Sequence, residues 1–211
     1  MSDKQLLDLL NFTKRHFQAK QYNEALKLVE VCLQQDKTMK EAWFIKGTIH
    51  FYTKEYEKAL ECFKEAVFLD SRYLDAIMNL GVVLSKLNRT VEAAEVFDSA
   101  IQLDPLYCVS WYNKGNVLAN IGKLENALSC YDKSLELDPY FPQAWFEKAN
   151  TLVLLISFQD AIKCYDRAIE LDPNNYEYIY NKAIVLEKLG NKEEADKFFR
   201  QVQQMKKGLQ V

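Results

Sequence analysis

The sequence predicts an all-α protein, a superhelical solenoid of about twelve antiparallel helices. Three observations support this prediction. The sequence repeats itself with a period of 34 residues. Each period holds two apolar stripes at helical spacing, separated by a short polar turn. Only 6 glycines and 4 prolines occur among 211 residues, which argues against a β-rich or disordered chain.

The period is clearest in a column of alanines with two companion columns. The alanines stand 34 residues apart, at Ala25, Ala59, Ala93, Ala127, Ala161 and Ala195. Four positions later comes a larger residue, at Val29, Phe63, Phe97, Tyr131, Tyr165 and Phe199. Twelve positions before the alanine comes a small one, at Thr13, Gly47, Gly81, Gly115, Ala149 and Ala183. A motif that recurs at a fixed period indicates a structural repeat and not a single active-site loop.

Six units follow one another without a gap, and we expect them to form a single domain. They are 6–39, 40–73, 74–107, 108–141, 142–175 and 176–209. Residues 1–5 hold the N-terminal cap of the first helix, and 210–211 are a tail. Ser2 and Gln5 have the spacing of a capping box, so the first helix is expected to begin at Asp3.

Within each unit, the small residue of the first stripe lets the second helix come close, and the alanine of the second stripe is its counterpart. The turn between the two helices holds Gly122 or Gly190 in two of the units, where a positive φ costs little. The second helix ends at a Leu-Asp-Pro sequence in three units, because the residue before proline disfavours the helical region. These prolines are Pro105, Pro139 and Pro173.

The unit that begins at Cys108 carries a set of residues found in a known repeat family. They are Trp111, Gly115, Ala127, Tyr131 and Pro139. This pattern resembles the tetratricopeptide repeat (TPR), and the resemblance covers residues 6 to about 208. It implies a right-handed superhelix of helix pairs. It also implies that one face of each first helix lines the inside of the superhelix, where partner peptides lie.

Two departures from the family pattern are informative. Lysine replaces the usual leucine before the small residue in four units, at Lys46, Lys114, Lys148 and Lys182. We expect each stem to lie along apolar surface with its ammonium in water. His16 and His50 replace the family tyrosine in consecutive units. They indicate either a pH switch or metal pair, or simply an aromatic position filled by histidine. The second interpretation is favoured, because no cysteine or carboxylate cluster obviously joins them.

With each unit numbered from 1, positions 2, 5, 9 and 12 share one face of the first helix. Position 6 lies beside them. Aromatic and asparagine side chains on this face suit an extended peptide, since asparagine can both donate to and accept from a backbone. The candidate contacts are Phe44, Phe51, Tyr52, Met78, Asn79, Tyr112, Asn113, Asn116, Phe146, Asn150, Tyr180 and Asn181. Aromatics and asparagines at these positions are also common in the family whatever is bound.

Two apolar clusters exceed the family pattern. Phe44, Phe51 and Tyr52 crowd the second unit. The fifth unit holds the other cluster, made of Phe146, Val153, Leu154 and Ile156. Exposed apolar clusters often mark partner sites, although such residues can equally be buried against a neighbouring helix or another copy of the chain.

Composition excludes several classes of function. The formal net charge of −3 is a poor match to nucleic acid. No apolar run reaches the roughly 18 residues that span a bilayer, and no signal-peptide pattern begins the chain. The five cysteines form no CxxC pair, which favours a reducing, cytoplasmic compartment. The repeats leave no room for a catalytic domain, and no catalytic residue, metal site or cofactor is expected.

We therefore expect a non-enzymatic adaptor that binds a protein or peptide segment. The alternative is a structural subunit that associates with itself or with a larger assembly. No extra polar helix covers the last unit, so Phe198 and Met205 are expected near an open end. A homo-oligomer formed through terminal repeats remains open.

Overall fold

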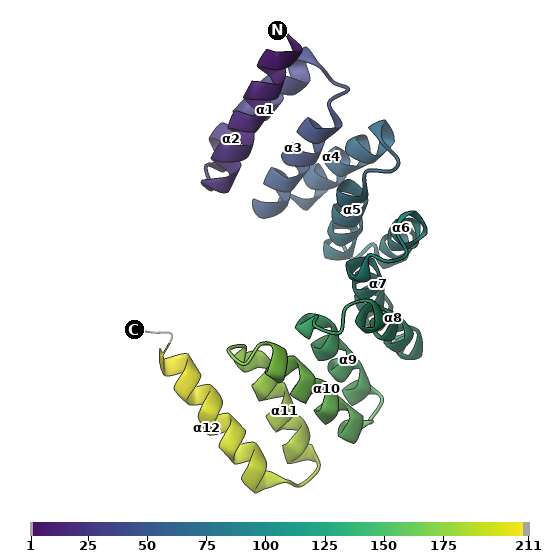
Figure 1. Ribbon diagram of the computed structural model, residues 1–211, viewed down its shortest axis with the longest axis vertical. Helices are drawn as coiled ribbons and strands as arrows, with labels where there is room; N and C mark the ends of the chain where they lie inside the picture. The colour runs from purple at the N-terminus through teal and green to yellow at the C-terminus, as the bar shows by residue number, and fades with distance from the viewer. Residues whose placement is uncertain (1, 209–211) are drawn as a thin grey trace. The chain divides into compact units, whose positions relative to one another are not determined.

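The structure, a computed structural model, describes residues 2–208, and within them there are twelve α-helices and no strand (Figure 1). The residues divide into two compact units that meet between Asp104 and Pro105. The helices of the first compact unit are α1 (Asp3–Gln18), α2 (Tyr22–Gln35), α3 (Lys40–Tyr52), α4 (Tyr56–Leu69), α5 (Leu74–Lys86) and α6 (Thr90–Leu103). Those of the second are α7 (Cys108–Asn120), α8 (Leu124–Leu137), α9 (Pro142–Leu154), α10 (Phe158–Leu171), α11 (Tyr176–Lys188) and α12 (Lys192–Gly208).

The helices keep the 34-residue phase of the sequence. After α1, the first helices begin at 40, 74, 108, 142 and 176, which are the first residues of the repeat units. Inside each compact unit, every helix packs against the next one along the chain. First helices of neighbouring repeats also touch, α1 with α3, α3 with α5, and α7 with α9. The first helices in these pairs therefore lie next to one another.

The N-terminus of α1 has the predicted cap. The Ser2 hydroxyl accepts from the backbone amide of Gln5, and the Gln5 side chain accepts from the backbone amide of Ser2 at 2.9 Å. The prediction that the first helix begins at Asp3 is confirmed.

The repeated small residues mark the tightest helix crossings. The six alanines of the column are buried, with 0–1% of each exposed. A Cβ placed on Gly115 would stand 2.6 Å from the ring of Tyr131, and one on Gly81 equally close to Phe97. The predicted close approach is confirmed, because these glycines leave room for the aromatic ring of the second helix.

The turns between paired helices all use a left-handed residue. Glycine adopts it at Gly122 and Gly190, but Ile156 adopts it in the turn between α9 and α10, with φ of 60°. A β-branched side chain at positive φ is strained. Ile156 is also 74% exposed, so burial of its side chain does not offset that strain.

The repeated lysines correct an expectation. The ammonium groups of Lys46, Lys148 and Lys182 are not simply solvated, because each pairs with an acidic residue on the second helix of the preceding repeat. The distances are 3.3 Å for Lys46–Glu30, 2.6 Å for Lys148–Asp132 and 2.6 Å for Lys182–Asp166. The stems do pack, since the Lys148 ammonium also lies over the ring of Trp145. These pairs join neighbouring repeats.

One of the two histidines has a carboxylate partner. His50 is buried, and its Nδ1 lies 2.6 Å from the Glu55 carboxylate. His16 makes the equivalent contact with the amide oxygen of Gln21. The separation in sequence is five residues in both cases, which spans the turn to the next helix. The spacing of residues in the sequence alone does not reveal this contact across the turn.

Candidate functional site

The candidate site is the face formed by positions 2, 5, 6, 9 and 12 of the first helices, here called the first-helix face. Aromatic rings form the base of this face. Each position-5 ring packs on the aromatic residue nineteen positions later in the same repeat. The pairs, with ring-centroid distances of 5.7–6.3 Å, are Phe44–Phe63, Tyr112–Tyr131, Phe146–Tyr165 and Tyr180–Phe199.

A second aromatic residue flanks three of these rings. It comes from the boundary with the following repeat, and the centroid distances are 4.7–5.2 Å. These pairs are Phe44–Tyr73, Tyr112–Phe141 and Phe146–Tyr178. The candidate rings are therefore half-buried, except for Tyr180, which is 43% exposed. Each presents only part of its surface to a partner.

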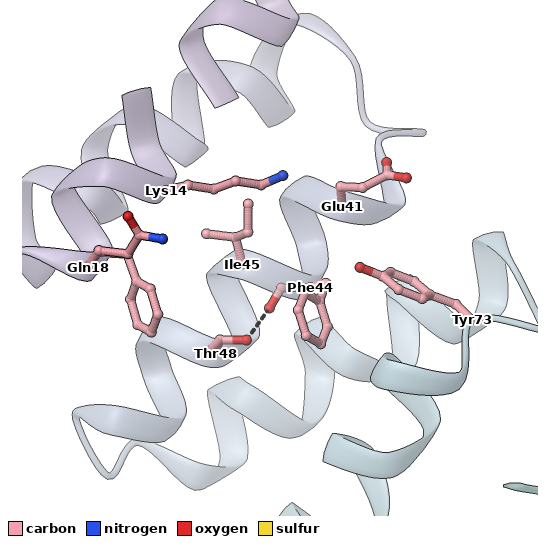
Figure 2. Close-up of a pocket in the computed structure, with 8 residues that line it drawn as sticks. Lys14, Gln18, Glu41, Phe44, Ile45, Thr48 and Tyr73 are labelled. Carbon is pink, nitrogen blue, oxygen red and sulfur yellow. Dashed lines mark hydrogen bonds between the residues drawn. The ribbon is translucent and has the colours of Figure 1, made fainter. Parts of the chain in front are cut away.

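The first-helix face of the first compact unit is hollowed by a cavity of about 250 Å³. Phe44 and Ile45 form part of its apolar lining, and Thr48 lies beside them with its hydroxyl bonded to the Phe44 carbonyl oxygen. Figure 2 shows the charged ends of Lys14 and Glu41 along one rim of the cavity. The volume is below the roughly 300–1,000 Å³ of drug-sized ligand sites, so the cavity suits one side chain of a larger partner.

Tyr73, from the loop before α5, closes another side of this cavity. Burial, together with the nearby Asp75, Glu41 and Asp70 carboxylates, raises the pKa of Tyr73 to about 12. Its hydroxyl therefore stays protonated and able to donate a hydrogen bond at neutral pH. The sequence interpretation did not single out Tyr73, because it treated only the first helices. The signal was present, since aromatic residues also end the third and fourth repeats, at Tyr107 and Phe141.

In the second compact unit, two candidate asparagines are held by the core. The Tyr131 hydroxyl donates to Asn116 Oδ1 at 2.8 Å, and the Tyr165 hydroxyl donates to Asn150 Oδ1 at 2.6 Å. Asn150 Nδ2 donates in turn to the Glu147 carboxylate at 3.1 Å. These internal bonds occupy the oxygen atom of each amide, and pairing of the two amides with a partner's backbone stays a prediction.

The two candidate residues on α5 are Met78 and Asn79. Only 7% of Met78 is exposed, so it offers little surface to a partner, and a groove contact there stays a prediction. The physical reason is that α5 packs this long apolar side chain into the core, as it does Ile77 and Leu80. Asn79 donates to the carbonyl oxygen of Asp75 on its own helix, at 2.8 Å. Asn113 and Asn181 are half-buried on the corresponding face of α7 and α11.

Phe51 and Tyr52 lie at the C-terminal end of α3 and do not themselves line the cavity, although Tyr52 contacts the lining residue Phe17. Tyr52 is 58% exposed and packs edge-on against Phe17 and stacks on Tyr22, while Phe51 contacts Tyr56. In the other predicted cluster, Leu154 and Ile156 are exposed. Each predicted cluster is therefore partly covered by its own repeats and partly open.

No metal site or membrane span accompanies this face. Within residues 2–208, no three His, Cys, Asp or Glu side chains come together as metal ligands. None of the helices described combines the length and apolar character that crossing a bilayer requires. The five cysteines are thiols, and burial raises the pKa of Cys62 to about 11.

Comparison with known families accounts for most of the chain. Tetratricopeptide repeat models match residues 109–141, 142–175 and 164–197. The middle TPR-like domain of cilia and flagella-associated protein 70 matches residues 9–105. The chain is a tetratricopeptide repeat protein. No curated protein sequence matches it.

Solved TPR structures resemble it closely in fold. PilW, a widely conserved type IV pilus biogenesis factor, is 25% identical with a TM-score of 0.87, over 96% of this chain and 94% of that one. Pseudomonas aeruginosa pilF is 21% identical with a TM-score of 0.82, over 96% and 92%. YrrB, a TPR protein with an unusual peptide-binding site, is 24% identical with a TM-score of 0.68, over 82% and 90%. At these identities the last two similarities show the fold alone.

Proposed function

We propose that this TPR protein is a non-enzymatic scaffold whose first-helix face binds an extended segment of a partner protein. The TPR fold supports a protein-interaction role in general. The observation that carries the finer proposal is the cavity beside Phe44. It lies on the predicted face, is lined mainly by apolar groups, and has room for one side chain.

Selection from a random-sequence peptide library displayed on phage tests the proposal. Phe44→Ala should weaken a selected peptide by about 2 kcal/mol or more, because a packed aromatic anchor dominates binding energy. The matched control is Phe68→Ala on α4, a second helix, where the ring is 84% exposed. Equal affinities for the two variants, both still folded, would place binding outside the cavity.

Self-association is the second candidate function, and one observation favours it. Leu154 and Ile156 project from the turn between α9 and α10 with 64% and 74% of their surface exposed. Large apolar side chains exposed together often mark a protein contact. Light scattering distinguishes this candidate from the peptide scaffold.

A further inference from the structure

One residue of the first-helix face carries a charge where its counterparts do not. Position 6 is Asn in four repeats and Ile in another, but the fifth repeat has Glu147. The side chain projects from α9 among the aromatic residues of the second compact unit. At position 6, the fifth repeat therefore differs from the other repeats in its charge and not only in its packing.

The Glu147 carboxylate is held in place by the core. Tyr165, which packs beneath Phe146, donates to Asn150, and Asn150 donates to Glu147 Oε2. This relay fixes the side chain through groups that are themselves buried or half-buried. It leaves Oε1 as an acceptor for another donor.

In the part of the chain that the structure describes, no cation neutralises this carboxylate. Among residues 2–208, no lysine or arginine lies within ion-pair distance of Glu147, and Lys148 beside it pairs with Asp132. Burial raises the pKa of Glu147, the Asn150 hydrogen bond lowers it, and Glu177 raises it again. A half-buried carboxylate that has lost water without gaining a counterion interacts strongly with a cation brought to it.

Aromatic rings surround the same position. Burial raises the pKa values of both Tyr112 and Tyr178, and the Glu147 charge adds to the shift at each. Tyr178 packs on Phe146 with ring centroids 4.7 Å apart. Ring faces attract cations, and the effect is stronger where water is excluded. Tyr112 is half-buried and can present part of its ring, whereas Tyr178 is buried, with 2% of its surface exposed.

The remaining charges near this face are a carboxylate, Glu177, and a lysine, Lys206. Position 2 of the last three repeats holds Val109, Gln143 and Glu177, so it adds a carboxylate and no base. The cation of α12 that comes near this face is Lys206, which lies over Tyr176 and Tyr180. The acidic part of the face is thus centred on Glu147, with Lys206 beside Tyr180.

We propose that the first-helix face of the second compact unit binds an arginine or lysine side chain of the partner segment, with Glu147 as its charge partner and Tyr112 beside it. This inference rests on the proposed function and specifies the chemistry of the bound segment. The complementary segment is basic at this position and aliphatic or aromatic nearby.

A random-sequence peptide library displayed on phage, selected on the full chain, tests this inference. Selected peptides should share a lysine or arginine at one position, and replacing that residue by methionine should weaken binding about tenfold or more. Glu147→Gln should weaken the basic peptide and leave the methionine peptide unchanged, as a double-mutant cycle requires. Glu125→Gln, the same change at an exposed position on α8, is the matched control and should change neither.

The outcomes separate this inference from the proposed function. Peptides that bind the first-helix face without a shared basic residue, or an equal loss for both peptides in Glu147→Gln, would overturn it and leave the scaffold proposal intact. A library that yields no binder would overturn both. If Glu147→Gln unfolds, the salt dependence of peptide binding to the wild-type protein tests the inference instead. Added salt should weaken binding of the basic peptide and leave binding of the methionine peptide unchanged.

Discussion

At the scale of single residues, the positions with small side chains at the helix crossings are expected to tolerate larger side chains least. Ala127 is fully buried where α7 crosses α8, and Gly115 lies against Tyr131 at the same crossing. The sequence predicted these contacts because the same small residue returns every 34 positions. A packed core responds to even one added methylene group.

Ala127→Leu should therefore destabilise the protein by roughly 1–3 kcal/mol through overpacking. Asn126→Leu introduces the same side chain one residue earlier, at an exposed position, and should have little effect. Thermal and urea denaturation of the two variants measures the difference. Similar midpoints for both would mean that the alanine column does not mark a tight crossing.

Glu55 gives the protein a pH dependence. Hydrogen bonds from Lys58 and then His50 lower the pKa of its carboxyl from the ordinary 4.5 to about 2. The ionised group therefore stabilises the fold above about pH 4.5, and this contribution is lost as the pH falls toward about 2. Glu55→Gln should lower the urea midpoint near neutral pH and have a smaller effect near about pH 3. The exposed Glu57→Gln serves as the control, and a loss that is the same at both pH values would contradict the assignment.

Residue-level prediction of the candidate site was less complete than that of the core. Phe44, Tyr112 and Phe146 were placed on the expected face from helical periodicity alone. Asn116 and Asn150 were also on that face, but periodicity does not reveal that a tyrosine hydroxyl fifteen residues later occupies each amide oxygen. Such bonds depend on where a second helix places its side chains.

At the scale of the helices, the sequence predicted the order of the elements and their phase. Two features were not predicted from the sequence, because they depend on contacts between repeats. Three of the lysines before the small residues pair with acids sixteen positions earlier, on a different helix. Tyr73 and Tyr178 lie at repeat boundaries and reach the first-helix face of the preceding repeat.

The turn between α9 and α10 supports a prediction about strain. Ile156 has a φ of 60°, where glycine is favoured over any residue with a Cβ. Ile156→Gly should be more stable than Ile156→Ala by about 0.5–1 kcal/mol, after allowing for the greater flexibility of unfolded glycine. Urea denaturation of the pair measures this difference. An alanine variant as stable as the glycine variant would show that the turn relaxes to a negative φ.

At the scale of the whole molecule, the open question is whether the chain binds another protein or itself. The peptide scaffold predicts a monomer at tens of micromolar in light scattering, with the exposed turn at Leu154 and Ile156 unoccupied by a second copy. Ile156→Asn should leave the measured mass unchanged. A wild-type dimer that this substitution disrupts would favour the self-associating subunit.

The central claim is that the first-helix face is the working surface of this TPR protein. The most direct measurement is amide chemical-shift mapping of a library-selected peptide on the isotopically labelled chain. The account predicts perturbations concentrated in the first helices of the repeats, including α3 around Phe44 and α9 around Glu147, with little change in α4, α8 and α10. Perturbations confined to those second helices would contradict it.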